Sequence, residues 1–229
     1  MNHLLAFLIL SAAGGLLFYM VEWLYNTKKW HVEFTRNIAH IGGGLLALSL
    51  PVFLKNQWWA LLLCGMFQFV MVVTHNSKYL RSIHGVKRKT YGSMAYPIAI
   101  FLVFMIWYHS ENFIHEPYGS NVYFNLPVLI LALCDPIATY FGYRYRTQKI
   151  KGTNKSISGF LAFFILACIL SILVLQGSHL FHNRAGFASV FFIALVAAIT
   201  ELYSKKGLDN LFIPIAVLLA MYIAEHFFN

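Results

Sequence analysis

The sequence predicts an all-α integral membrane protein, a bundle of about eight transmembrane helices that forms one domain over residues 1–229. Two observations lead to this prediction. Hydrophobic residues make up 59% of the 229 residues and charged residues only 11%, which is more apolar than a soluble domain needs. The apolar residues also fall in long stretches, and a bilayer requires about 20 of them per helix because it offers no water to backbone N–H and C=O groups.

Eight stretches approach this length, although the fourth and the seventh are short. They span residues 4–25, 38–54, 58–73, 94–109, 122–143, 157–176, 187–200 and 211–228. Of the 17 Lys and Arg residues, 15 lie in or beside the four loops that follow the odd-numbered stretches. Because basic residues near helix ends stay on the cytoplasmic side of a membrane, these loops are predicted to face the cytoplasm and both termini the opposite side.

The formal net charge of +9 follows from this topology and from contact with anionic lipid headgroups. It does not indicate nucleic-acid binding, because no basic domain folds outside the membrane. The residues that can do chemistry lie in or beside the four basic loops. This distribution predicts one active face, on the cytoplasmic side of a bacterial inner membrane or an endomembrane.

The first candidate motif lies at the entry to the second stretch. Spacings of three and four residues put Glu33, Arg36, Asn37 and His40 on one helical face, where a cation, an amide and an imidazole can converge on a ligand. The glycines at 42–44 then allow a close approach by another helix or a substrate chain. The alternative is an interfacial arginine that extends to the headgroups beside a structural histidine.

Asp135 is the second candidate, because it interrupts the apolar fifth stretch about two turns from its cytoplasmic end. A carboxylate at that depth is costly unless it is paired, neutralised or bound to a metal. Pro136 also leaves a helical carbonyl without its usual partner. The alternative is a structural aspartate that bonds to a neighbouring helix.

The loop before the sixth stretch is a candidate anion site. Lys155, Ser156, Ser158 and Gly159 run into a helix N-terminus, where backbone N–H groups and the helix dipole favour negative charge. The residue order of a P-loop, GxxxxGK(S/T), is missing, so this loop shares with a P-loop only the attraction of an anion to a helix N-terminus. The basic cluster at residues 87–89 can also contact phosphate oxygens, but such clusters occur merely to fix topology.

Glu201, Asp209 and Asn210 flank the last basic loop. With Asp135 they supply three carboxylates that can surround a divalent cation, which prefers hard oxygen ligands and shares them with substrate phosphates. Asp209 or Asn210 can instead simply cap the eighth helix. Four even-numbered helices begin at this face, so their positive dipole ends suit a metal-bound nucleoside triphosphate that a lipid approaches from the side.

In this order, the motifs resemble those of the superfamily of dolichol kinases, phytol kinases and CTP-dependent diacylglycerol kinases. The matching residues are Glu33, Arg36, His40 and Gly43; Tyr91, Gly92 and Ser93; Asp135, Pro136, Ala138 and Gly142; Lys155, Ser156, Ser158 and Gly159; and Glu201, Gly207, Asp209, Asn210 and Pro214. The resemblance implies an enzyme that moves the γ-phosphate of CTP, or of another nucleoside triphosphate, to a polyprenol, a phytol-like alcohol or a diacylglycerol.

We combine the motifs with this resemblance in a mechanistic hypothesis that assigns roles to particular residues. The expected catalytic residues are Asp135, His40 and Arg36, with Asp135 or His40 as the proton acceptor. The expected ligands of magnesium, or of another divalent cation, are Asp135, Asp209 and Glu201. The expected nucleotide-binding residues are Arg36, Lys89, Lys155, Ser156, Ser158, Gly159 and Asn210. Asn37 departs from the family, which commonly has lysine there; Lys89 is a candidate substitute.

Two other functions fit parts of the pattern. A phosphatidate cytidylyltransferase also joins CTP to a membrane lipid, although its usual C-terminal signature is not apparent. A transporter of an anionic solute is expected to distribute polar residues through the membrane depth, whereas here they crowd one face.

Overall fold

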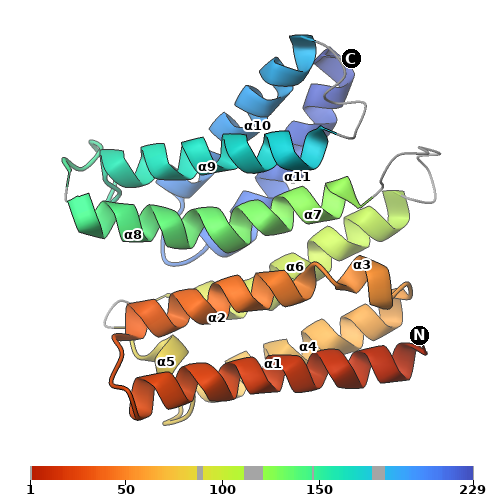
Figure 1. Ribbon diagram of the computed structural model, residues 1–229, viewed down its shortest axis with the longest axis vertical. Helices are drawn as coiled ribbons and strands as arrows, with labels where there is room; N and C mark the ends of the chain where they lie inside the picture. The colour runs from red at the N-terminus through yellow and green to blue at the C-terminus, as the bar shows by residue number, and fades with distance from the viewer. Residues whose placement is uncertain (1, 87–89, 111–120, 146, 177–183, 229) are drawn as a thin grey trace.

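The computed structural model describes residues 2–86, 90–110, 121–145, 147–176 and 184–228. These residues are mainly helical (Figure 1), and their one strand-like pairing is an isolated bridge between Lys149 and Ser156. The helices are α1 (His3–Asn26), α2 (Val32–Ala47), α3 (Leu50–Phe53), α4 (Gln57–His75), α5 (Arg81–His84), α6 (Gly92–Ser110), α7 (Val122–Leu129), the π-helical turn η1 (Ile130–Cys134), α8 (Asp135–Tyr145), α9 (Ile157–Leu175), α10 (Arg184–Tyr203) and α11 (Asp209–Phe228).

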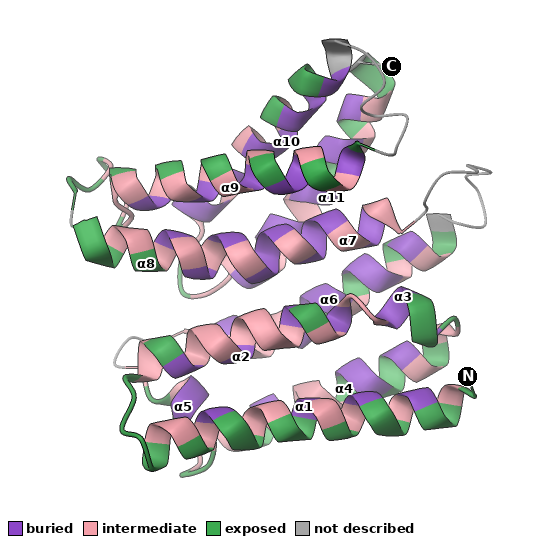
Figure 2. Cartoon of the chain, viewed as in Figure 1, coloured by how far each residue is buried: buried purple, intermediate pink, exposed green. Residues whose placement is uncertain are grey.

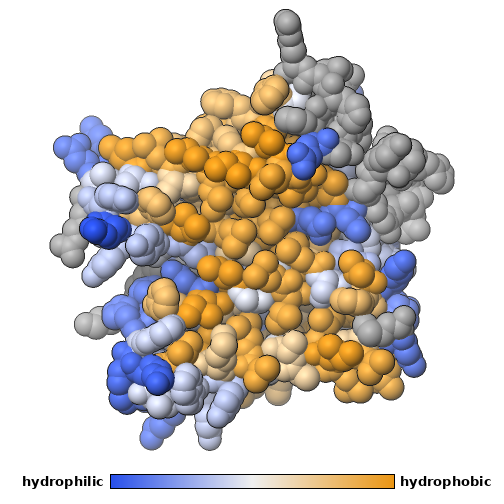
Figure 3. Space-filling model, viewed as in Figure 1, coloured by the Kyte–Doolittle hydropathy of each residue, from blue (hydrophilic) through white to orange (hydrophobic). Residues whose placement is uncertain are grey.

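Within the described residues, seven helical runs are long and apolar enough to cross a bilayer. The outward faces of α1 and α9 are exposed (Figure 2), and their exposed side chains include Leu16, Ile165 and Leu173. An apolar band crosses the middle of the molecule, with hydrophilic residues at its two ends (Figure 3). Lipid can cover such a surface whereas water opposes its exposure, so the chain has the character of a membrane protein.

The second helix differs from the predicted stretch at 38–54. α2 begins at Val32, where His31 Nδ1 accepts a hydrogen bond from the Glu33 N–H at 3.3 Å, and it ends at Ala47. Pro51, tolerated in the first turn of a helix, then lies in the short α3. α2 has only 16 residues and is not among the seven long runs, so the count of eight transmembrane helices stays a prediction.

The bundle has two halves, one of α1 to α6 and one of α7 to α11 (Figure 1). α2 packs on η1, and α6 packs on α11, which joins the halves. The two termini lie at one end of the bundle, and the basic loops lie at the other. A hydrogen bond of 2.8 Å from the Tyr91 N–H to the Lys206 carbonyl ties two of these loops together.

The run from α7 through η1 to α8 is the most buried of the seven. Leu126, Val128 and Leu131 on it are fully buried. The sequence predicts an interruption at Asp135 and Pro136, and the structure has a π-turn at Ile130–Cys134 directly before them. Proline supplies no N–H and π-turns recur at functional sites, so this turn indicates a candidate site around Asp135.

Candidate active site

Arg36 and His40 lie one turn apart on α2, on the shared face that the spacing predicts. A Cβ atom added to Gly92 would lie 2.8 Å from Arg36 Nη2 and 2.9 Å from Asn210 Nδ2, so the guanidinium packs against the start of α6. Arg36 Nη1 is buried and has no hydrogen-bond partner in the described part of the chain. One nitrogen of the guanidinium is therefore buried, with a donor left for an anionic oxygen.

His40 bridges the two halves of the bundle. Its Nε2 lies 2.9 Å from the carbonyl oxygen of Leu131, and its own carbonyl accepts a hydrogen bond of 3.0 Å from the Tyr96 hydroxyl. The π-turn register pairs the Leu131 carbonyl with Pro136, which has no N–H, so His40 supplies the missing donor. Because a carbonyl only accepts, Nε2 carries the proton, and in the neutral form of the ring Nδ1 keeps a lone pair.

Asp135, Lys155, Glu201 and Asp209 form what we term the charged cluster. Lys155 Nζ donates to Glu201 Oε1 and lies 3.7 Å from Asp209 Oδ2. The Asp135 carboxylate interacts electrostatically with Lys155, Asp209 and also His40. The charges of α8, of the loop before α9, of α10 and of α11 therefore interact with one another.

Lys155 stays positively charged in this cluster. Burial lowers its pKa, but the charges of Asp135, Glu201 and Asp209 outweigh burial and raise the pKa above the ordinary lysine value. Glu201 is almost completely buried, and its Oε2 has no hydrogen-bond partner among the described residues. A buried oxygen of this kind is costly unless a cation or a donor reaches it.

Hydrogen bonds within the protein close the start of α9. Ser156 Oγ accepts from the Gly159 N–H at 3.1 Å, and Thr147 Oγ1 accepts from the Ser158 N–H at 2.8 Å. A Cβ on Gly159 would lie 2.9 Å from the Ala138 carbonyl oxygen, so glycine lets α9 pack closely on α8. Ser156, Ser158 and Gly159 thus have packing roles. A phosphate oxygen would have to replace the hydroxyl oxygens that now accept from the Ser158 and Gly159 N–H groups, so the predicted phosphate contacts stay predictions.

Asn210 and Gly207 hold the start of α6 against the loop before α11. Asn210 Nδ2 donates to the Gly92 carbonyl at 2.8 Å. The Asn210 side chain therefore does more than cap α11. Gly207 has a φ of +81°, and a Cβ there would lie 2.2 Å from Thr90 Oγ1 and 2.5 Å from the Gly92 N. Glycine is required at 207 by both conformation and space.

The predicted metal site has carboxylate oxygens in the charged cluster, but they do not form a ready ligand set. No three His, Cys, Asp or Glu side chains within the described ranges come close enough to hold a metal ion together. The sequence predicts a metal ion between Glu201 and Asp209, but in the structure the Lys155 ammonium group contacts both carboxylates. Carboxylate oxygens are nevertheless the ligands that Mg²⁺ prefers, so the metal roles of Asp135, Asp209 and Glu201 stay a prediction.

Tyr96 belongs to the site but was not predicted from the sequence: it contacts the His40 ring with centroids 4.5 Å apart. Its spacing of three residues from Ser93 puts both on one face of α6 and is the signal that was available. The predicted Lys89 lies outside the described residues.

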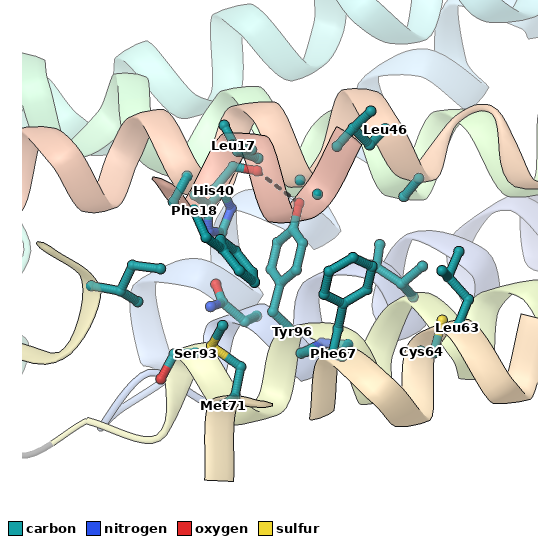
Figure 4. A pocket seen from close by; sticks show the side chains of 18 of the residues that line it. Leu17, Phe18, His40, Leu46, Leu63, Cys64, Phe67, Met71, Ser93 and Tyr96 are labelled. Atoms are coloured by element: carbon teal, nitrogen blue, oxygen red, sulfur yellow. Dashed lines mark hydrogen bonds between the residues drawn. The ribbon is translucent and has the colours of Figure 1, made fainter. Parts of the chain in front are cut away.

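An apolar cavity of about 130 Å³ lies between α1, α2, α4 and α6 (Figure 4). Most of its lining is aliphatic or aromatic, including Leu17, Leu63 and Phe67. Its polar lining includes Arg36, His40, Ser93 and Asn210. Arg36 and His40 interact electrostatically with Asp209 and Asp135, and Asn210 directly follows Asp209, so the cavity adjoins the charged cluster.

Two known proteins are similar to this chain. A phytol kinase of Synechocystis is 25% identical over 202 residues, which cover 85% of this chain and 80% of that protein. An uncharacterized protein of Methanocaldococcus jannaschii is 36% identical over 104 residues, which cover 44% of this chain and 47% of that protein. No family model matches the chain, and no solved structure matches it. The resemblance that the motifs indicate thus agrees with a distant relationship to a phytol kinase.

Proposed function

We propose that this membrane protein is a lipid-alcohol kinase, which transfers the γ-phosphate of CTP, or of another nucleoside triphosphate, to a lipid hydroxyl at the cytoplasmic face. The main support is that Arg36, His40 and Asn210 line an apolar cavity and also adjoin the charged cluster. A charged donor and an apolar acceptor can therefore meet at the same three side chains. The distant relationship to a phytol kinase supports the same reaction class.

On the donor side, Arg36 and Lys155 supply positive charge for the triphosphate. Phosphoryl transfer depends mostly on positioning and charge stabilisation, and the unpartnered Arg36 Nη1 is available for a phosphate oxygen. Asp135, Asp209 and Glu201 would hold magnesium, which neutralises phosphate charge when it is bound. Lys89 is proposed as a further cation at this site.

On the acceptor side, the lipid hydroxyl enters beside His40. Its oxygen forms a bond to the γ-phosphorus while the bond from that phosphorus to the β–γ bridging oxygen breaks, and the nucleoside diphosphate leaves. The hydroxyl proton passes to His40 Nδ1 or to the Asp135 carboxylate, which interacts electrostatically with the His40 ring.

Product analysis tests this proposal. The purified protein, in lipid nanodiscs with magnesium, is incubated with labelled CTP or ATP and a panel of phytol, polyprenols and diacylglycerol. A kinase yields a phosphorylated alcohol and a nucleoside diphosphate, whereas a cytidylyltransferase acting on phosphatidate releases pyrophosphate. Pyrophosphate release, or no transfer to any alcohol on the panel, would contradict the proposal.

A further inference from the structure

We infer that the apolar cavity between α1, α2, α4 and α6 binds one hydrocarbon chain of the acceptor, with its hydroxyl at the end marked by Arg36, His40 and Asn210. This inference rests on the proposed function and narrows the acceptor to single-chain alcohols. It also names a second binding surface, far along α2 from the reacting atoms.

The polarity of the lining gives the chain a direction. On α2 the lining runs from Arg36 and His40 through Gly43 to Ala47, which is about 16 Å along the helix axis. The charged and imidazole side chains occupy the first part of this path, and the later part has only small or apolar groups. An amphiphile with a single polar end fits this gradient, because its chain avoids water while its hydroxyl keeps polar partners.

Small residues keep the cavity open. Ala39, Gly43 and Ala47 recur at spacings of four residues on the α2 face that lines it. A Cβ on Gly43 would lie 3.5 Å from Tyr96 Cε1, an ordinary contact, so the missing side chain leaves usable space. At Gly14, by contrast, the Phe67 ring fills that space, with Cζ 2.2 Å from a built Cβ.

The volume favours one chain over two. A cavity of about 130 Å³ is close to the engineered cavity of roughly 150 Å³ that holds one benzene molecule. It can enclose part of one hydrocarbon chain but not two chains side by side, which favours a single-chain alcohol over a diacylglycerol. The remainder of a long chain would extend past Ala47, at the end of α2.

The test uses variants at two neighbouring positions on α2. Ala47→Phe fills the distal part of the cavity, and Ala47→Leu fills it less. Leu45→Phe is the matched control, because Leu45 is exposed on the outer side of the same helix. Each protein is assayed with a series of single-chain alcohols of increasing length, after size-exclusion chromatography and thermal unfolding establish that it is folded.

Ala47→Phe is expected to lower kcat/KM at least tenfold for long alcohols while short alcohols keep their rate. Ala47→Leu is expected to have a smaller effect in the same direction, and Leu45→Phe none. If both Ala47 variants are folded and keep the wild-type dependence on chain length, the chain does not bind here, although the kinase proposal stands. Faster transfer to diacylglycerol than to any single-chain alcohol also overturns the inference.

A binding measurement separates this inference from the proposed function. A long-chain alcohol with a photoreactive diazirine near its distal end is irradiated with the wild-type protein without nucleotide. Cross-links to α2 or α4 that excess phytol removes and that Ala47→Phe abolishes support the cavity, even if no kinase activity is found. Cross-links confined to the outer faces of the helices contradict it.

Discussion

The charged cluster and the apolar cavity are adjacent, yet they form in different ways. The cluster joins Lys155 to carboxylates from three other segments through strong electrostatic interactions. The cavity stays open because some of its lining residues, such as Gly43 and Ala47, are small and leave space between the helices. Substitutions in the cluster should therefore affect donor binding and stability, whereas substitutions in the cavity should affect the choice of acceptor.

Asp135→Asn is expected to have the largest effect on activity. It removes a negative charge from the cluster at nearly constant volume, and loss of one such electrostatic group lowers kcat by roughly 10²- to 10³-fold. Phosphate transfer measured in nanodiscs checks this. Glu225→Gln is the control, because Glu225 accepts a hydrogen bond from Tyr123 at the opposite end of the bundle. Equal rates for the wild type and a folded Asp135→Asn protein would rule out a role for this carboxylate.

Lys155→Met should be the most destabilising change, at about 3 kcal/mol, because it leaves the buried Glu201 without its cation. Adding Glu201→Gln should restore part of the loss. The pKa of Lys155 is raised on balance, so the pairing contributes fully below the ordinary lysine pKa of about 10.4 and is lost only as pH rises through the raised value. Thermal unfolding at neutral pH should therefore reveal the full difference, and a double variant less stable than Lys155→Met would contradict this pairing.

The sequence predicts much of the charged cluster and little of the cavity. Asp135 and Glu201 are recognisable because acids are rare in apolar segments, and basic loops predict the end of the bundle at which they meet. The pairing of Lys155 with Glu201, 46 residues apart, has no local pattern. The cavity depends on how four helices pack, and small residues in an apolar helix are equally consistent with tight packing.

Helix boundaries and the π-turn also needed the structure. The apolar stretch predicted at 38–54 omits the polar first turns of α2, although the motif from Glu33 to His40 was expected on one helical face; the cap at His31 lets the helix begin at Val32. The interruption near Asp135 was predicted, but its π-helical form and the hydrogen bond from His40 to Leu131 depend on tertiary contact. Local propensity does not specify such a contact between segments 91 residues apart.

Gly207→Ala and Gly152→Ala together separate the cost of steric crowding from the cost of a positive φ. Gly207 and Gly152 have φ values of +81° and +82°, but a Cβ meets Thr90 and Gly92 at 207 and nothing within 4 Å at 152. Gly152→Ala should therefore cost only about 1 kcal/mol, the conformational term. Gly207→Ala should cost more and also slow phosphate transfer, because it displaces the start of α6. Equal unfolding temperatures for the two variants would show that the close approach to Gly92 does not matter.

The substitution His84→Gln should have the smallest effect, which appears in the pH dependence of the free energy of unfolding. Burial, followed by the nearby His75, lowers the pKa of His84 to about 4. The folded protein keeps this ring neutral while the unfolded chain takes up a proton below its pKa of about 6.5. Stability is thus fully present above that value and declines toward pH 4. His84→Gln should flatten this part of the unfolding curve, and an unchanged slope would argue against it.

The central claim is that donor and acceptor meet at residues shared by the charged cluster and the cavity. Steady-state kinetics of Arg36→Met test it most directly, because Arg36 lines the cavity and interacts with Asp209. The account predicts that KM rises for both the nucleotide and the alcohol, whereas Lys155→Met raises it for the nucleotide alone and Ala47→Phe for the long alcohol alone. An Arg36→Met protein in which neither KM changes, or only one does, would contradict the account.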